Sequence, residues 1–383
     1  MKQQPQEGPM QLDVKNYPVA PEGLDLEQVY IYVRHGERTP VRVRMSDPPA
    51  SIPADWQMCN TAKSFHETVA GYSSTVDDGL WYKQVVENRL GKTAEGLCLL
   101  GELTDIGKQS TYAFGAALRS LYIDRSTNIA RTIESLQHIV HGVYPPSACA
   151  PDTIPAIIIR NGIDENLVSN TLACKRLAIL ELQFAQAAVA TWNSRLEPLD
   201  KKVSKYISGK PLRLDGIPRA SGILDTVFKS EEGRRLGMGR LLSDVSQKMH
   251  NKAHPNLTSK SEDSAKLLVH TTHDSTLAAL LCTFDVFDDK WPPFTSSVTF
   301  ELFRKRIPPS QQTNLQRALS SVWRRDEHYV RMRYKNKNMV LPMCASEGKH
   351  LPGSPEFCTL DAFRKRVDEL TPRDWVGECF PRT

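Results

Sequence analysis

A dense group of charged side chains follows a short apolar segment near the start of the sequence. Arg34, His35 and Arg38 lie in the run RHGERTP, directly after EQVYIYV. Arginine offers a planar set of donors that matches phosphate oxygens, and two guanidinium groups neutralise much of the charge of a dianion and of its transition state. A histidine placed among cations has a lowered pKa, and the ring nitrogen of a neutral histidine can act as a nucleophile. The run is typical of a site that binds phosphate and attacks it.

Two later groups could complete such a site. Arg125 begins the run RSTNIART ahead of a predicted helix and could add a third guanidinium group, together with backbone donors at the helix N-terminus. Arg131, at the end of the same run, is assigned instead to an ion pair with an acid or to loop carbonyls. The pair His273 and Asp274 offers one more donor and a carboxyl group that can protonate a leaving alkoxide. Together these groups predict covalent phosphoryl transfer without a metal ion.

Each group also has a structural interpretation. Arginine and histidine after a strand often serve solvation or an ion pair, and a His-Asp pair is a common helix N-cap. The order of the three groups, each at a predicted strand-to-loop junction, favours the functional interpretation. Other histidines are assigned to the core or the surface, including His66, His138 and His270.

The elements that must position these groups can be predicted from apolar periodicity. Apolar runs predict buried strands over residues 27–33, 155–160 and 265–271, of which the first and last run directly into His35 and His273. Ligand sites of open α/β sheets lie beyond the carboxyl ends of strands, so both histidines are expected there. Helices are expected from Thr104 to about 121, from Arg131 to about 143 and from Leu360 to 370. Alternation over 297–303 and 328–334 predicts an antiparallel edge pair.

These elements indicate an α/β fold, with a mixed, mainly parallel sheet flanked by helices and an inserted all-α cap. The catalytic core is expected to comprise residues 24–160 and 265–383, the cap 161–264 and an N-terminal extension 1–23. The region from Cys174 to about His254 has helical periodicity almost throughout, which is the basis for the cap.

Composition excludes several classes of protein. The chain has 383 residues, 40% hydrophobic and 24% charged, with a net charge of +5 and no long basic block, so nucleic-acid binding is not indicated. No apolar run is long enough for a membrane span, and no signal peptide is evident, which favours the cytoplasm or an organelle lumen. The eight cysteines form no CxxC pair, which argues against zinc. Most are expected to be buried thiols, although Cys344 and Cys358 could pair in an oxidising compartment.

With these motifs the sequence resembles the histidine acid phosphatase family, the phosphatase branch of the RHG superfamily. RHGERTP and His273-Asp274 match the hallmark of that family, and LTDIG at 103–107 and RSTNIART are also similar. DKWPPF at 289–294, together with RSTN, is most similar to the lysophosphatidic acid phosphatase subgroup. The resemblance implies a phosphoglycerate mutase-like core with a helical cap. Mutases of the superfamily have a shorter RHG signature, and phytases often continue HD as HDTN, whereas Ser275 and Thr276 follow here.

The resemblance also implies a mechanism at acid pH without a cofactor. His35 would attack phosphorus and become phosphohistidine, while Asp274 would protonate the leaving alcohol. The phosphate oxygens would be held by Arg34, Arg38, Arg125 and His273. The substrate would be a phosphate monoester, either a lysophospholipid phosphate or a small organic phosphate, and no motif indicates an oligomeric state.

The segment before Arg125 departs from the family pattern. The predicted helix from Thr104 runs into Arg125 without the loop and strand that the family has there, and most connections take about 2–6 residues. Either residues 121–124 form a shortened strand, or a segment is missing. The alternative to an enzyme is therefore a binding or scaffold protein that kept the fold, binds phosphate and does not release it from esters.

Overall fold

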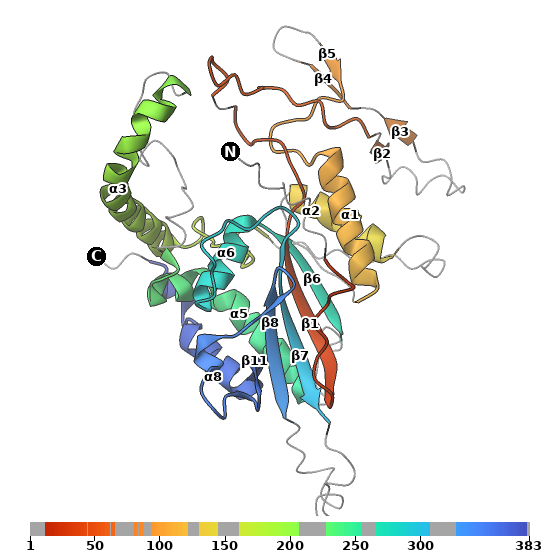
Figure 1. Ribbon diagram of the computed structural model, residues 1–383, viewed down its shortest axis with the longest axis vertical. Helices are drawn as coiled ribbons and strands as arrows, with labels where there is room; N and C mark the ends of the chain where they lie inside the picture. Colours follow the sequence, from red (N-terminus) through yellow and green to blue (C-terminus); the bar gives the residue numbers. More distant parts are fainter. Residues whose placement is uncertain are drawn as a thin grey trace, which may run out of the picture.

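The computed structural model describes eleven ranges of the chain: residues 12–43, 45–61, 63–65, 80–82, 84–87, 93–121, 130–144, 161–206, 227–254, 265–306 and 327–380 (Figure 1). The expected strand at 155–160, the segment at 122–129 and Arg125 lie outside these ranges.

A mixed sheet forms the centre of the molecule. Its strands follow the order β10-β11-β8-β7-β1-β6, and β9 also pairs with β8. The strands span β1 Leu24–Arg34, β6 Leu267–Thr272, β7 Ser297–Lys305, β8 His328–Tyr334, β9 Lys337–Met339, β10 His350–Leu351 and β11 Ser354–Thr359. Two short ladders lie outside it, β2 (Lys63–Phe65) with β3 (Leu80–Tyr82) and β4 (Val85–Glu87) with β5 (Thr93–Glu95).

Strand pairing agrees with the expected mixed sheet but corrects two details. Within the described strands only β1 and β6 pair in parallel, so the antiparallel share is larger than expected. The strands at 297–303 and 328–334 do pair antiparallel, but they are not an edge pair. β7 lies between β1 and β8, and β11 covers the outer side of β8. The hairpin of β10 and β11 is short and polar, so its sequence gave no strand signal.

Alternate residues of β1 pack into two separate cores, because successive side chains of a strand point to opposite faces. Val29, Ile31 and Val33 face α1 (Asp105–Arg119) and α2 (Ala130–Val143). Tyr30 and Tyr32 face the larger core on the other side. That core includes residues of α5 (Glu231–Ala253), α6 (Asp274–Thr283) and α8 (Leu360–Leu370). Figure 1 shows α1 and α2 on one side of the sheet and α5 and α8 on the other.

The helices begin where their capping residues predict. Thr104 accepts a hydrogen bond from Gly107 N at the start of α1, and Thr359 caps α8 in the same way through Ala362 N. The helices expected from Thr104, Arg131 and Leu360 are observed, with ends that differ from expectation by at most two residues.

The segment expected to form the cap contains two long helices of different character. α3 (Lys175–Val203) buries only Leu177, Leu180 and Ala188 among its described residues and extends away from the sheet in Figure 1. It is followed by a short 3-10 turn, η3 (Ser204–Tyr206). α5 instead buries Leu242, Val245 and other side chains in the larger core against the sheet. The division into core and cap stays a prediction. Of the two long helices in this segment, α3 is the one that extends away from the sheet.

Cysteine pairing overturns the expectation of mostly buried thiols. Cys59 pairs with Cys98, Cys174 with Cys379, and Cys344 with Cys358. Only the last pair is suggested by the sequence, because it flanks a short loop rich in glycine and proline. In the structure the 3-10 turn η7 (Pro342–Cys344) ends at the first cysteine of this pair. The second pair joins the start of α3 to the end of α9 (Trp375–Glu378), across a separation of 205 residues that spacing does not reveal. Cys282 is buried and does not take part in a disulfide.

Candidate active site

The parallel pairing of β1 and β6 brings the two predicted histidines together. Arg34 pairs with Thr272 at the carboxyl ends of the strands, and His35 N donates to Thr272 O at 3.0 Å. His273 follows as the residue that precedes α6, and the centroids of the His35 and His273 rings lie 5.5 Å apart. Histidines from sequence positions more than 200 residues apart thus share one buried site.

The environment of His35 leaves one ring nitrogen free for attack. Nδ1 lies 2.9 Å from Gly36 O, so this nitrogen carries the hydrogen and Nε2 keeps its lone pair. The residue is 1% exposed, and burial lowers the pKa of His35 well below its ordinary value, with His273 and Arg34 acting in the same direction. The ring is therefore neutral at pH values where an exposed histidine is protonated, which suits a nucleophile.

His273 is arranged as a hydrogen-bond donor toward the same space. Its Nδ1 lies 3.4 Å from Arg131 Nη2, and because a guanidinium group can only donate, Nδ1 accepts. The hydrogen of the neutral ring is then on Nε2, which is buried and has no partner. Burial lowers the pKa of His273 to about 4, and Arg131 contributes to this shift.

Three guanidinium groups surround these rings. Arg34 is 7% exposed, its burial lowers its pKa to about 10, and its Nη2 lies 2.7 Å from Asp274 Oδ2. Burial also lowers the pKa of Arg38 and of Arg131. The Nε atoms of all three side chains are buried without a partner. Such donors carry a desolvation cost unless an acceptor is supplied, so the arrangement is suited to an anion.

Arg131 was not expected at this site. It had been assigned to an acid or to loop carbonyls, whereas the structure places it beside His273. The first turn of α2 is held there by Thr271 Oγ1, which donates to Thr132 O at 3.0 Å, and by Ser135 Oγ, which accepts from Gly36 N at 3.2 Å. A cation in the first helical turn opposes the helix dipole. That mismatch is the signal in the sequence that could have marked Arg131 as a candidate site residue.

Asp274 stands at the start of α6 with both carboxyl oxygens engaged. Oδ1 accepts from the backbone N of Ser275 at 2.8 Å. Oδ2 accepts from Arg34 and from the indole Nε1 of Trp291, the latter at 3.0 Å. A carboxyl group held in this way beside His35 could give a proton to a leaving group once it is protonated.

The DKWPPF run forms one wall of the site, which motif matching alone did not reveal. Pro292 O accepts from Arg34 Nη1 at 2.6 Å, and the ring of Phe294 lies 3.9 Å from Arg34 Cζ and 5.6 Å from the His35 ring. An aromatic face against a guanidinium group stabilises it electrostatically. Trp291 belongs to the same wall and donates a hydrogen bond to Asp274.

No metal centre is found in the part of the chain that the structure describes, where no three His, Cys, Asp or Glu side chains gather closely enough to hold an ion. Within the same ranges no helix has the length and apolar character needed to span a membrane.

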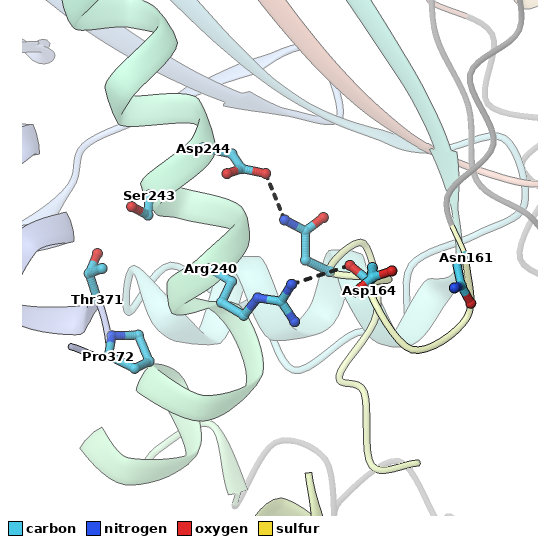
Figure 2. A pocket seen from close by; sticks show the side chains of 8 residues that line it. Asn161, Asp164, Arg240, Ser243, Asp244, Thr371 and Pro372 are labelled. Atoms are coloured by element: carbon cyan, nitrogen blue, oxygen red, sulfur yellow. Dashed lines mark hydrogen bonds between the residues drawn. The ribbon is translucent and has the colours of Figure 1, made fainter. Parts of the chain in front are cut away.

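A separate polar cavity of about 570 Å³ lies beside α5 and contains none of these residues (Figure 2). Two hydrogen bonds join residues of its lining, from Asn166 Nδ2 to Asp244 at 2.7 Å and from Arg240 Nη2 to Asp164 O at 3.3 Å. Among the described residues, no buried side-chain atom without a partner belongs to this lining, in contrast to the site around His35.

The chain is similar to known proteins along most of its length. The family model of the histidine phosphatase superfamily, branch 2, matches residues 25–224 and 224–335. A probable acid phosphatase of Schizosaccharomyces pombe is 28% identical over 450 aligned positions, which cover 94% of this chain and 95% of the relative. Lysophosphatidic acid phosphatase type 6 of Bos taurus is 22% identical, over 91% of this chain and 84% of the relative.

A solved structure shares the fold at low sequence identity. The Hafnia alvei phytase in complex with myo-inositol hexakis sulphate is 14% identical and has a TM-score of 0.54, covering 94% of this chain and all of the phytase chain. The family match extends over most of the chain and includes both histidine motifs. The chain belongs to the histidine phosphatase superfamily, branch 2, and is a histidine acid phosphatase, an enzyme that hydrolyses phosphate monoesters.

Proposed function

We propose that the residues around His35 perform this hydrolysis in two steps. In the first, His35 Nε2 attacks phosphorus, the bond between phosphorus and the ester oxygen breaks, and Asp274 gives its proton to the departing alcohol. In the second, water gives a proton to Asp274 and its oxygen bonds to phosphorus, while the bond between phosphorus and His35 Nε2 breaks, which releases phosphate and returns the lone pair to Nε2. The hydrogen bond from Nδ1 to Gly36 O supports this assignment, because it leaves Nε2 as the attacking atom and orients the ring.

Arg34, Arg38, Arg131 and His273 hold the phosphate oxygens in this proposal. The observation that carries it is the set of buried donors without partners, Nε of each arginine and Nε2 of His273, in a site whose nucleophile is kept neutral by burial. A phosphate dianion supplies the acceptors and the negative charge that these groups lack. Arg125 stays a predicted ligand outside the described residues, and Arg131 provides the third guanidinium group here.

The proposed substrate is a lysophospholipid phosphate or a small organic phosphate. The similarity to the bovine lysophosphatidic acid phosphatase supports the lipid, and it is shared across most of both chains. Turnover of a lipid substrate is expected to rise with detergent or vesicles, whereas turnover of a sugar or inositol phosphate is not. The three disulfides support an oxidising compartment as the place where the enzyme acts.

The test is phosphate release from an aryl phosphate across about pH 4–8, in the presence of EDTA, for the wild type and His35→Ala. His254→Ala provides a matched control, because His254 is exposed at the end of α5. The wild type and the control should release phosphate with a bell-shaped profile, and alkaline quenching with radiolabelled substrate should trap label on both of them but not on His35→Ala. If all three proteins bind phosphate and release none from the ester, the scaffold alternative is correct.

A further inference from the structure

The indole of Trp291 is the one contact to the Asp274 carboxyl, among those described, that comes from the loop before β7. Its Nε1 lies 3.0 Å from Oδ2, and both residues are partly buried. The second contact to Oδ2 is Arg34 Nη2, at 2.7 Å. The third donor, Ser275 N, belongs to α6 and bonds to Oδ1. The orientation of the carboxyl group therefore depends on one charged and two neutral donors.

Arg34 and Trp291 differ in whether a bound phosphate competes with Asp274 for their donors. Arg34 is one of the groups proposed to hold phosphate oxygens, so its donors are shared between Asp274 and the substrate. Trp291 carries a single donor and no charge. That donor is already used in the hydrogen bond to Asp274, so a bound phosphate does not compete for it. Trp291 can therefore hold the carboxyl group in place throughout the cycle.

The loop that carries Trp291 is itself fixed to the catalytic residues. Arg34 donates to Pro292 O at 2.6 Å, Thr295 N donates to His35 O at 3.3 Å, and Ser296 Oγ donates to Pro293 O at 2.7 Å. Phe294 packs against both Arg34 and His35. Because Arg34 and His35 anchor this loop, the indole keeps a fixed position relative to the nucleophile.

We propose that Trp291 is a positioning residue for the proton transfer, and that it holds the Asp274 carboxyl toward the leaving group through its indole N–H. This inference rests on the proposed role of Asp274 as proton donor. A positioning residue of this kind affects substrates unequally. An alkyl alcohol leaves only with a proton, whereas a nitrophenol leaves as a stable anion and needs little help.

The experiment compares kcat/KM for an alkyl phosphate, glycerol 2-phosphate, with kcat/KM for p-nitrophenyl phosphate. Trp291→Phe keeps the ring and removes the N–H donor. The ratio of alkyl to aryl activity should fall about tenfold in this variant, which corresponds to the loss of one hydrogen bond of ordinary strength. Asp274→Asn should lower the ratio further. The aryl activity of Trp291→Phe should fall less than its alkyl activity, because the nitrophenol leaves with little need of a proton.

Trp375→Phe is the matched control. Its indole Nε1 donates to Leu236 O at 2.9 Å, also from a partly buried position, where the residue packs against the larger core. This variant loses a comparable hydrogen bond and should keep the wild-type ratio. If Asp274→Asn lowers the ratio and Trp291→Phe does not, the positioning role is wrong while the proposed function stands. If Asp274→Asn leaves the ratio unchanged, the role proposed for Asp274 is wrong, and the inference about Trp291 is overturned with it.

Discussion

Gly36 and Gly107 lie backbone against backbone, where the RHG loop meets the start of α1. A Cβ atom added to Gly36 would lie 2.4 Å from Gly107 O, and one added to Gly107 would lie 2.1 Å from Glu37 O. Thr104, the N-cap of α1, also donates to Glu37 O from both its backbone N and its Oγ1. The RHG loop therefore packs directly against the first turn of α1. The glycines of RHG and LTDIG both permit this close backbone contact.

Gly107→Ala is expected to impair both stability and catalysis, because its new methyl group meets backbone atoms that cannot rotate away. Overpacking of this kind costs about 1–3 kcal/mol of unfolding free energy. Displacement of the RHG loop by a fraction of an ångström should lower kcat/KM for an aryl phosphate by about 100-fold. Urea unfolding and steady-state kinetics measure the two effects. Gln109→Ala, at an exposed position of the same helix, should change neither.

Arg131→Ala should weaken the binding of inorganic phosphate as a competitive inhibitor. Loss of a charge-assisted hydrogen bond corresponds to about a tenfold or larger rise in the inhibition constant. Arg131→Lys should recover part of the loss, because the charge returns without the planar pair of donors. Arg119→Ala is the control, since Arg119 donates to Val143 O at the far end of α1. Equal inhibition constants for Arg131→Ala and the wild type would remove Arg131 from the site.

Local sequence signals were sufficient to predict the strands and helices that carry the two histidines. β1 and β6 are apolar runs that end in charged residues, and Thr104 is a typical N-cap, so these elements depend on nearby residues alone. β10 and β11 could not be predicted in this way. They are short and partly exposed, and β11 pairs with β8 through contacts made only in the folded sheet.

The motifs of the candidate site could be predicted from the sequence, but the positions of Arg131 and Trp291 in it could not. His35 and His273 each follow a recognisable strand. Arg131 is instead placed by hydrogen bonds from Thr271 and Gly36 to its helix, which no spacing in the sequence encodes. Trp291 lies in a loop, and its importance depends on the direction of one N–H bond. Such long-range polar contacts are visible only in three dimensions.

Burial of His273 should make stability depend on pH. Its pKa is lowered to about 4 from an ordinary value of 6.5, chiefly by burial. Between these pH values the unfolded chain binds a proton that the folded chain does not. The free energy of unfolding is therefore highest above pH 6.5 and falls as the pH is lowered toward 4, by on the order of 3 kcal/mol from this residue. Urea unfolding at a series of pH values should show a steeper loss for the wild type than for His273→Asn. Parallel curves would contradict the shift.

The disulfides Cys174–Cys379 and Cys344–Cys358 should differ in how much stability is lost when each is removed. Cys174 and Cys379 close a loop of 205 residues, while Cys344 and Cys358 close one of 14. A cross-link stabilises mainly by restricting the unfolded chain, which corresponds to about 5 kcal/mol for the long loop and about 3 kcal/mol for the short one. C174S/C379S should accordingly unfold at a lower urea concentration than C344S/C358S. The long-range disulfide also holds the end of α9 against α3, where Arg176 N donates to Cys379 O at 2.9 Å. If C344S/C358S proves the less stable variant, native packing around that pair outweighs the restriction of the unfolded chain.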